Sequence, residues 1–548
     1  MPANFHPAPT PAAPSHPAPA PAHDVPAHDV PAHATPAHAA PENPPAPRAT
    51  RRIAADLVAA AVVAAVTPLC LLQAPNAIAW VLGPAGGVAG GADTPAAVLR
   101  AAGLALPAMA AVAGIAGLAV IRWRAWPVLL TGLLIMAVAD VAGGSARTVA
   151  AIGTVRVLHG VAAGLALPAA LGLAWERAPR PRRLLAALWA ATTVAGLAAV
   201  SAVTRERLAS GGWHGALAPY PWLTGVALTV AALYALLADG PGAPRPALRS
   251  RTSRRAPQPQ HTHQPQPPRT SRARQDATQE RAQLAVLTVP GLGLATLSVG
   301  VTYRSPAALL AAGAVAILIL YGVAAVASAD RLVGGPLCFP MVAAVTGLVV
   351  APAAGAITSL RELSPEPAHS QSWLPLGVTA AAVAAGVAAA LTLRRHPRPV
   401  VLAGLVVAME GLAAARLAGP FVPDLVLAGV SAPLAGGLAA ALTAALTGTE
   451  APGTKAPGTE TTVPKASALS GASLLLSGVM TGYLAAGAVQ VRMVTQLAAG
   501  SNHPQAGERL ALAGAVGAWE LAGLVSVLIA IAVIILTGRA RRAGAVTR

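Results

Sequence analysis

The chain has 548 residues, of which 55% are hydrophobic and 11% charged, and its mean hydropathy is +0.61. These values exclude an ordinary soluble domain, because such domains carry roughly 25% charged residues. The formal net charge of +18 would suggest a nucleic-acid partner in a soluble protein. In so apolar a chain, basic loops beside a membrane explain the charge better, so we expect no nucleic-acid binding.

The first 50 residues are rich in proline, alanine and histidine and contain a five-residue repeat that begins at Pro21. Such a segment cannot bury a core, so we predict a disordered tail over residues 1–50. Its six histidines could bind zinc or nickel loosely, but we favour low-complexity sequence without a function. We therefore expect no metal site and no cofactor.

Fourteen apolar segments follow, and each is long enough to cross a bilayer, which takes about 20 residues at ~1.5 Å per residue. We predict spans over residues 53–72, 102–121, 126–144, 155–175, 184–203, 220–238, 284–301, 307–327, 337–357, 374–393, 400–417, 426–446, 468–489 and 510–536.

The basic residues predict the orientation of these spans. With the N-terminus in the cytoplasm, the inner segments carry 28 Lys and Arg residues, the outer loops carry 9, and Arg156 lies within a span. Cytoplasmic loops carry such an excess, so we predict that both termini are cytoplasmic. We expect a multi-pass protein of the cell membrane whose basic loops contact anionic lipids.

A polar segment with nine arginines, residues 240–283, divides the chain and reads as a disordered cytoplasmic linker. Six predicted spans precede it and eight follow. If the first two of the eight form an inserted helical hairpin, six spans remain for each half. The predicted domains are the tail 1–50, a six-helix bundle 53–239, the linker 240–283, the hairpin 284–327, a second six-helix bundle 337–536 and a basic tail 537–548.

The segment that begins at Thr154 reads TVRVLHGVAAGLALPAA. It resembles the fourth-span pattern, R-x-x-Q-G followed by small residues and P-A, of the fourteen-span drug:proton antiporter branch of the major facilitator superfamily. Arg156 and Gly160 match that pattern, and His159 stands where glutamine is usual. The resemblance implies an all-α polytopic membrane protein with two six-helix bundles and two extra central helices.

Other signatures of that family are eroded. In the loop pattern G-x-L-A-D-R-x-G-R-R, Gly117 and Arg122 match, while Ile121 replaces the acid. The acid usual late in the first span is Gln73 here. The glycines and proline of the fifth-span antiporter signature are also replaced. These departures leave open whether transport is retained.

Ionisable and polar residues inside spans are the candidates for a proton or solute pathway, because burying charge in a membrane is costly. The candidates are Gln73, Arg156, His159, Glu410 and Glu520. The resemblance puts the helices of Glu410 and Glu520 at the periphery of the bundle, so hydrogen bonding to a neighbouring helix is the alternative role for these two.

Arg156 and His159 are three residues apart and share a helix face, which the resemblance places beside a central cavity. Histidine titrates near neutral pH, so His159 is a candidate proton carrier. Asp140 lies near the outer end of the preceding predicted span, at a depth similar to that of Arg156. We therefore predict a structural ion pair between Asp140 and Arg156, because a buried guanidinium needs an acceptor.

No glycine-rich nucleotide loop and no cluster with catalytic metal spacing occurs, so we expect no enzyme activity. The expected cavity helices carry few acids, which favours an apolar or weakly polar solute. We predict a monomeric secondary transporter that exports an amphipathic or lipophilic small molecule by alternating access, with proton antiport as its energy source. The alternative is a transporter-derived membrane scaffold or sensor that moves no solute.

Overall fold

The computed structural model describes residues 46–73, 101–217, 221–238, 288–299, 306–329, 337–362, 374–418, 424–448, 465–498 and 504–546. All regular structure in these ranges is helical. The predicted disordered tail and the basic linker after residue 238 lie largely or wholly outside the described residues.

Six helices form the first half of the chain. They are α1 (Ala46–Gln73), α4 (Ala105–Arg122), α5 (Ala125–Gly143), α6 (Val149–Trp175), α7 (Pro179–Leu217) and α8 (Pro221–Ala238). Each covers most or all of one predicted span. Local chemistry fixes several starts: Thr148 caps α6 by accepting a hydrogen bond from the backbone of Ala151, and proline is the first residue of α7 and α8.

The second half continues with a short helix at Thr288–Val299 and seven longer ones. These are α10 (Pro306–Ala329), α11 (Phe339–Glu362), α12 (Leu374–Thr392), α13 (Pro397–Ala418), α14 (Asp424–Thr447), α15 (Lys465–Ala498) and α16 (Pro504–Val546). The predicted basic tail at the C-terminus is largely a continuation of α16.

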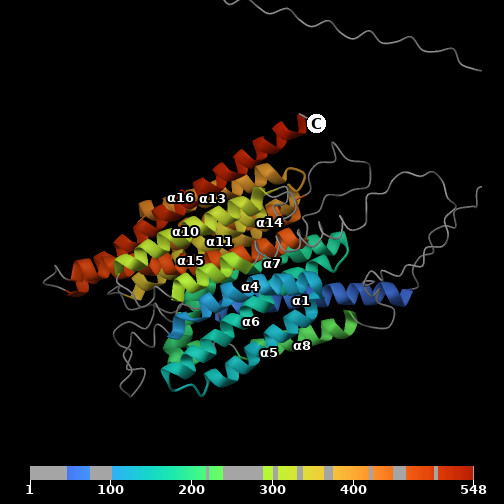
Figure 1. Cartoon of the computed structure of the whole chain (residues 1–548), viewed down its shortest axis with the longest axis horizontal. Helices are drawn as coiled ribbons and strands as arrows, with labels where there is room; N and C mark the ends of the chain where they lie inside the picture. The colour runs from blue at the N-terminus through green and yellow to red at the C-terminus, as the bar shows by residue number, and fades with distance from the viewer. Residues whose placement is uncertain are drawn as a thin grey trace, which may run out of the picture. The chain divides into compact units, whose positions relative to one another are not determined.

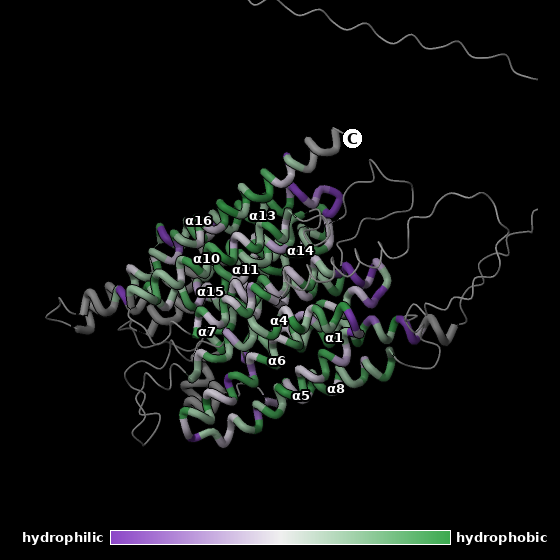
Figure 2. Tube along the Cα trace, in the orientation of Figure 1, coloured by the Kyte–Doolittle hydropathy of each residue, from purple (hydrophilic) through white to green (hydrophobic). Residues whose placement is uncertain are grey.

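Among the described residues, eleven helices are long and apolar enough to cross a membrane. Three shorter apolar helices, Thr288–Val299, Phe339–Ala353 and Ala432–Thr447, coincide with the other three predicted spans. The chain is therefore a multi-pass helical membrane protein, while the number of fourteen spans stays a prediction. Figure 2 shows that hydrophobic residues dominate the helices and that hydrophilic ones gather mainly near helix ends.

The helices of each half pack mainly on one another. In the first half α6 packs against both α4 and α5, and in the second half α15 packs against α11, while α14 packs against α12 and α13. Two sets of contacts join the halves: α15 lies against α4 and α6, and α7 lies against α11, α12 and α14. Figure 1 shows α1, α5, α6 and α8 on one side of this seam and α13, α14 and α16 on the other.

Candidate functional site

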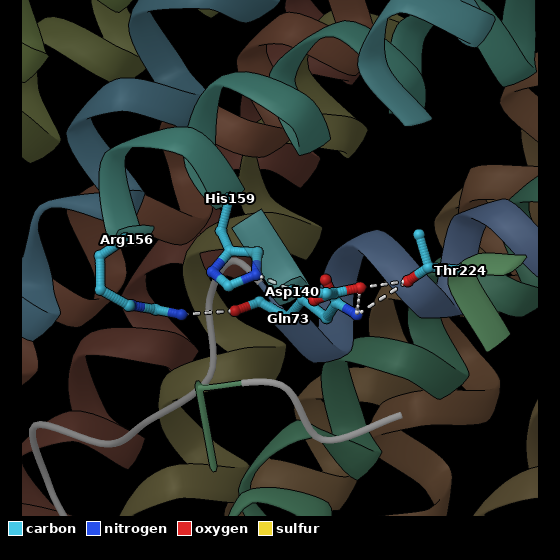
Figure 3. Close-up of polar contacts among 5 residues, drawn as sticks. All are labelled: Gln73, Asp140, Arg156, His159 and Thr224. Atoms are coloured by element: carbon cyan, nitrogen blue, oxygen red, sulfur yellow. Dashed lines mark hydrogen bonds and ion pairs between the residues drawn. The ribbon is translucent and has the colours of Figure 1, made fainter. Parts of the chain in front are cut away.

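Five buried polar side chains from four helices meet in the first half of the chain (Figure 3). Gln73 is the last residue of α1, Asp140 lies in the last turn of α5, and Thr224 lies in the first turn of α8. Arg156 and His159 lie in the first half of α6. None of these side chains is more than 6% exposed, so their hydrogen bonds must come from the protein itself.

The Asp140 carboxylate is the centre of this cluster. Its Oδ1 lies 3.1 Å from Nε2 of His159. Its Oδ2 accepts a hydrogen bond of 2.5 Å from the Thr224 hydroxyl and one of 3.2 Å from the Gln73 amide nitrogen. The same Gln73 nitrogen also donates to the Thr224 oxygen at 3.2 Å. Partners from three other helices thus satisfy a carboxylate that burial would otherwise make costly.

The hydrogen bonds described for Arg156 go to backbone carbonyls, and its predicted ion pair with Asp140 stays a prediction. Its Nε donates to the Ala102 carbonyl at 2.9 Å, and its Nη1 donates to the Gln73 carbonyl at 2.6 Å, while Asp140 faces His159. Arg156 precedes His159 by almost one turn of α6, which brings it to the end of α1, where backbone carbonyls lack intrahelical partners. His159, one turn deeper, is level with the carboxylate.

Within the described part of the chain, two polar atoms of the cluster have no hydrogen-bond partner, namely Nδ1 of His159 and Oε1 of Gln73. Both residues are fully buried. A ring nitrogen can bind or release a proton, and an amide oxygen accepts a hydrogen bond. The cluster therefore combines a carboxylate, an imidazole and an open acceptor, which is chemistry suited to binding a proton or a polar group of a solute.

Close packing of α6 fixes the position of His159. The next residue, Gly160, lies so close to α4 that a Cβ at this position would overlap the Ala105 carbonyl. One turn further on, a Cβ at Gly164 would come within 2.7 Å of the Met109 carbonyl. Only glycine allows the two backbones to approach this closely, as is usual for small residues between membrane helices.

The other predicted candidates lie elsewhere in the fold. Glu410 is exposed on the outside of α13, and Glu520 lies on α16 close to Arg416. Gly117 lies against Leu469 of α15, and Arg122 is the last residue of α4. The structure thus brings together Gln73, Asp140, Arg156 and His159, and leaves both glutamates in the second half of the chain.

Sequence reasoning missed Thr224. Threonine is common in membrane helices, so the residue type alone carried no signal. Its depth was the available clue, since Thr224 lies near the start of α8 and Asp140 near the end of the antiparallel neighbour α5. Among the described residues, no group of three or more His, Cys, Asp or Glu side chains could hold a metal ion.

No protein-family model matches the chain, and no curated protein sequence matches it. Similar solved structures include the proton:xylose symporter XylE of the major facilitator superfamily, at 12% identity and a TM-score of 0.49, with 86% of this chain and 95% of that chain covered. The nucleoside transporter NupG is similar at 13% identity and a TM-score of 0.45, with 86% and 98% covered.

A structure from work on proton-dependent oligopeptide transporters is similar at 13% identity and a TM-score of 0.49, with 89% of this chain and 99% of that chain covered. These proteins are transporters of a sugar, a nucleoside and peptides, by their descriptions. At such identities and with TM-scores below 0.5, the likeness carries no conclusion about the activity of this chain.

Proposed function

We propose that this chain is a secondary transporter that moves an amphipathic small molecule across the membrane by alternating access, and that the Asp140–His159 pair binds the coupling proton. The observation that carries the proposal is the contact of 3.1 Å between these two side chains, buried where four membrane helices meet. Ionisable groups at such positions are expensive, and their usual role is functional.

The geometry supports a proton-linked change of the cluster. Histidine is the side chain that ordinarily titrates near neutral pH, and its Nε2 lies within hydrogen-bond distance of a carboxylate that can share a proton with it. Adding or removing one proton alters which atoms of His159 and Asp140 donate and which accept. Because Thr224 and Gln73 bind the same carboxylate, a proton on this pair changes the hydrogen bonds that join α1, α5, α6 and α8.

The kind of solute is inferred from the helices along the seam between the halves. Their buried polar side chains in the described part of α11, α14 and α15 are hydroxyls: Thr346, Thr443, Thr447, Ser467, Ser470, Ser473, Ser477 and Thr481. Hydroxyls among aliphatic side chains suit an apolar or weakly polar solute. Export and proton antiport follow from the resemblance of the α6 motif, and anionic lipids are proposed to contact the basic loops.

Proton flux in liposomes tests this proposal. The purified full chain is reconstituted with a pH-sensitive dye inside, and a panel of lipophilic compounds is added under an imposed pH gradient. We expect one or more compounds to dissipate the gradient, and Asp140→Asn to abolish the effect. Glu410→Gln is the matched control, because this acid is exposed on α13 and lies outside the cluster.

The absence of compound-dependent flux in both gradient directions would contradict the proposal and favour a transporter-derived scaffold or sensor. Equal loss of flux in Asp140→Asn and Glu410→Gln would remove the cluster from the mechanism.

A further inference from the structure

A short helix of the second half lies against the first half. The helix Thr288–Val299, here called the seam helix, precedes α10 in the chain. A Cβ placed on its Gly291 would overlap the Ala110 carbonyl of α4 and would lie 3.8 Å from the Ser477 hydroxyl of α15. Since α4 and α15 belong to different halves and pack on each other, the seam helix lies where the halves meet, near the middle of both predicted spans.

Only one face of the seam helix is buried. Gly291, Leu294, Ala295 and Ser298 are buried, and their spacing places them on a single helix face. The opposite face carries apolar residues that are exposed and suit contact with lipid, namely Val289, Leu292 and Val299. The seam helix is therefore a surface element that covers the seam rather than a member of either core.

The helix that follows is anchored in the second half alone. α10 packs against α15 and α11, and a Cβ placed on its Gly313 would lie 3.1 Å from the Cα of Ala485 in α15. The seam helix, by contrast, contacts both α4 and α15. Separation of the halves along this seam therefore requires the seam helix to leave at least one of its two neighbours.

The surface of α15 beneath the seam helix is polar and unsatisfied. Ser477 is 1% exposed, and Thr481, one turn further along the same helix face, is fully buried. Within the described residues neither hydroxyl has a hydrogen-bond partner, whereas Thr346 and Thr447 each donate to a carbonyl one turn back in their own helix. A buried hydroxyl without a partner is costly, so water that reached this surface would be stabilising.

We propose that the seam helix is a movable strap, which closes the seam in the state described and leaves it in a second state that admits water to Ser477 and Thr481. In the closed state the close approach of Gly291 to α4 holds the helix in place. In the open state the two hydroxyls gain hydrogen bonds, which offsets part of the lost packing. This movement is separate from the proton-binding cluster around Asp140 and does not depend on the proposed transport.

The reaction rate of a buried thiol measures this opening. Ser477→Cys is introduced into the full chain, which is purified in lipid nanodiscs and treated with a hydrophilic maleimide. Mass spectrometry follows alkylation at position 477 and at native Cys70, which is free and buried. The two positions are 1% and 0% exposed, so both are shielded in the closed state. We expect position 477 to react about tenfold faster, which corresponds to ~1.4 kcal/mol.

Two glycines of the seam helix provide a matched pair of variants. Gly291→Ala adds a methyl group that overlaps the Ala110 carbonyl, so it should unseat the helix and raise the rate at position 477 about tenfold further. Gly293→Ala adds the same methyl group where no described atom lies within 4 Å, so it should leave the rate unchanged. Both variants alter helix propensity equally, so their difference isolates the contact with α4.

Equal rates at position 477 and Cys70 would show that the seam helix stays in place and would overturn the proposal. An equal response to Gly291→Ala and Gly293→Ala would do the same, because the contact with α4 would then not hold the helix. So would a rise that Cys70 shares, since the whole bundle would have loosened.

The first comparison needs no change in the seam helix, so it decides the question even if Gly291→Ala does not fold. The assay also needs no solute. A negative proton-flux result therefore leaves the strap standing, and failure of the strap leaves the proton site untouched.

Discussion

Thr224 offers the sharpest test of the buried cluster, because the same helix provides a matched control. The residue is 1% exposed, and its hydroxyl donates to the Asp140 carboxylate at 2.5 Å and accepts from Gln73. Thr224→Val keeps the shape and removes the hydroxyl. Hydrogen bonds to charged groups contribute about 1.5–3 kcal/mol, so we expect a loss of that size in the free energy of unfolding.

The control is Thr229→Val, five residues along α8. Thr229 is exposed, and its hydroxyl donates to the Gly225 carbonyl of its own helix at 2.8 Å. Replacing it should change the free energy of unfolding by less than about 0.5 kcal/mol. Both variants keep a β-branched side chain in the same helix, so the difference between them isolates the contact with the cluster.

The assay is equilibrium unfolding in mixed micelles, with SDS as the denaturant and circular dichroism as the signal. A double-mutant cycle with Asp140→Asn then measures the coupling between Thr224 and the carboxylate, which should fall within about 0.5–3 kcal/mol. A coupling below that range, or equal losses in Thr224→Val and Thr229→Val, would refute the hydrogen bond and with it the described arrangement of α5 and α8.

Three further predictions concern other parts of the chain. His159→Gln retains a donor for the neighbouring carboxylate, so the free energy of unfolding should change by less than ~1 kcal/mol. The pH dependence of solute-driven proton flux between about pH 5 and 8 should flatten. An unaltered pH profile would exclude the histidine as the proton carrier. Gly160→Ala should destabilise the protein by about 1–3 kcal/mol, because the added methyl group overlaps α4. At Gly153 an added Cβ would lie 3.4 Å or more from every neighbouring atom, so Gly153→Ala should be neutral or stabilising in the same unfolding assay. Ser145→Cys should react with an impermeant maleimide on intact cells and His396→Cys only after permeabilisation, and the reverse pattern would invert the predicted orientation.

Helix positions were largely predictable from the sequence, because burial in lipid requires long apolar runs. Every predicted span overlaps a described helix, but the ends differ. α6 begins at Val149, earlier than the predicted 155, because Thr148 supplies a cap that hydropathy does not detect. α7 runs on to Leu217, well beyond the apolar part of its sequence, since a helix continues wherever its backbone bonds are satisfied.

The sequence predicted most of the residues that form the candidate site, but not which of them contact one another. Depth along a span follows from counting residues, and this placed Asp140, Arg156 and His159 near one level. The direction in which each side chain points depends on helix rotation and packing, which one sequence does not reveal. Hence the carboxylate was assigned to Arg156, whereas it lies against His159 and binds Thr224 of α8.

Gln73 binds the cluster in two chemically separate ways. Its side-chain nitrogen donates to Asp140, and its backbone carbonyl accepts from Arg156. Every amino acid carries that carbonyl, so a mutational scan at position 73 reports the amide contact alone and leaves the anchor of the arginine unseen. A substitution at position 73 can therefore remove the contact with Asp140 while the backbone carbonyl still holds α6 to the end of α1.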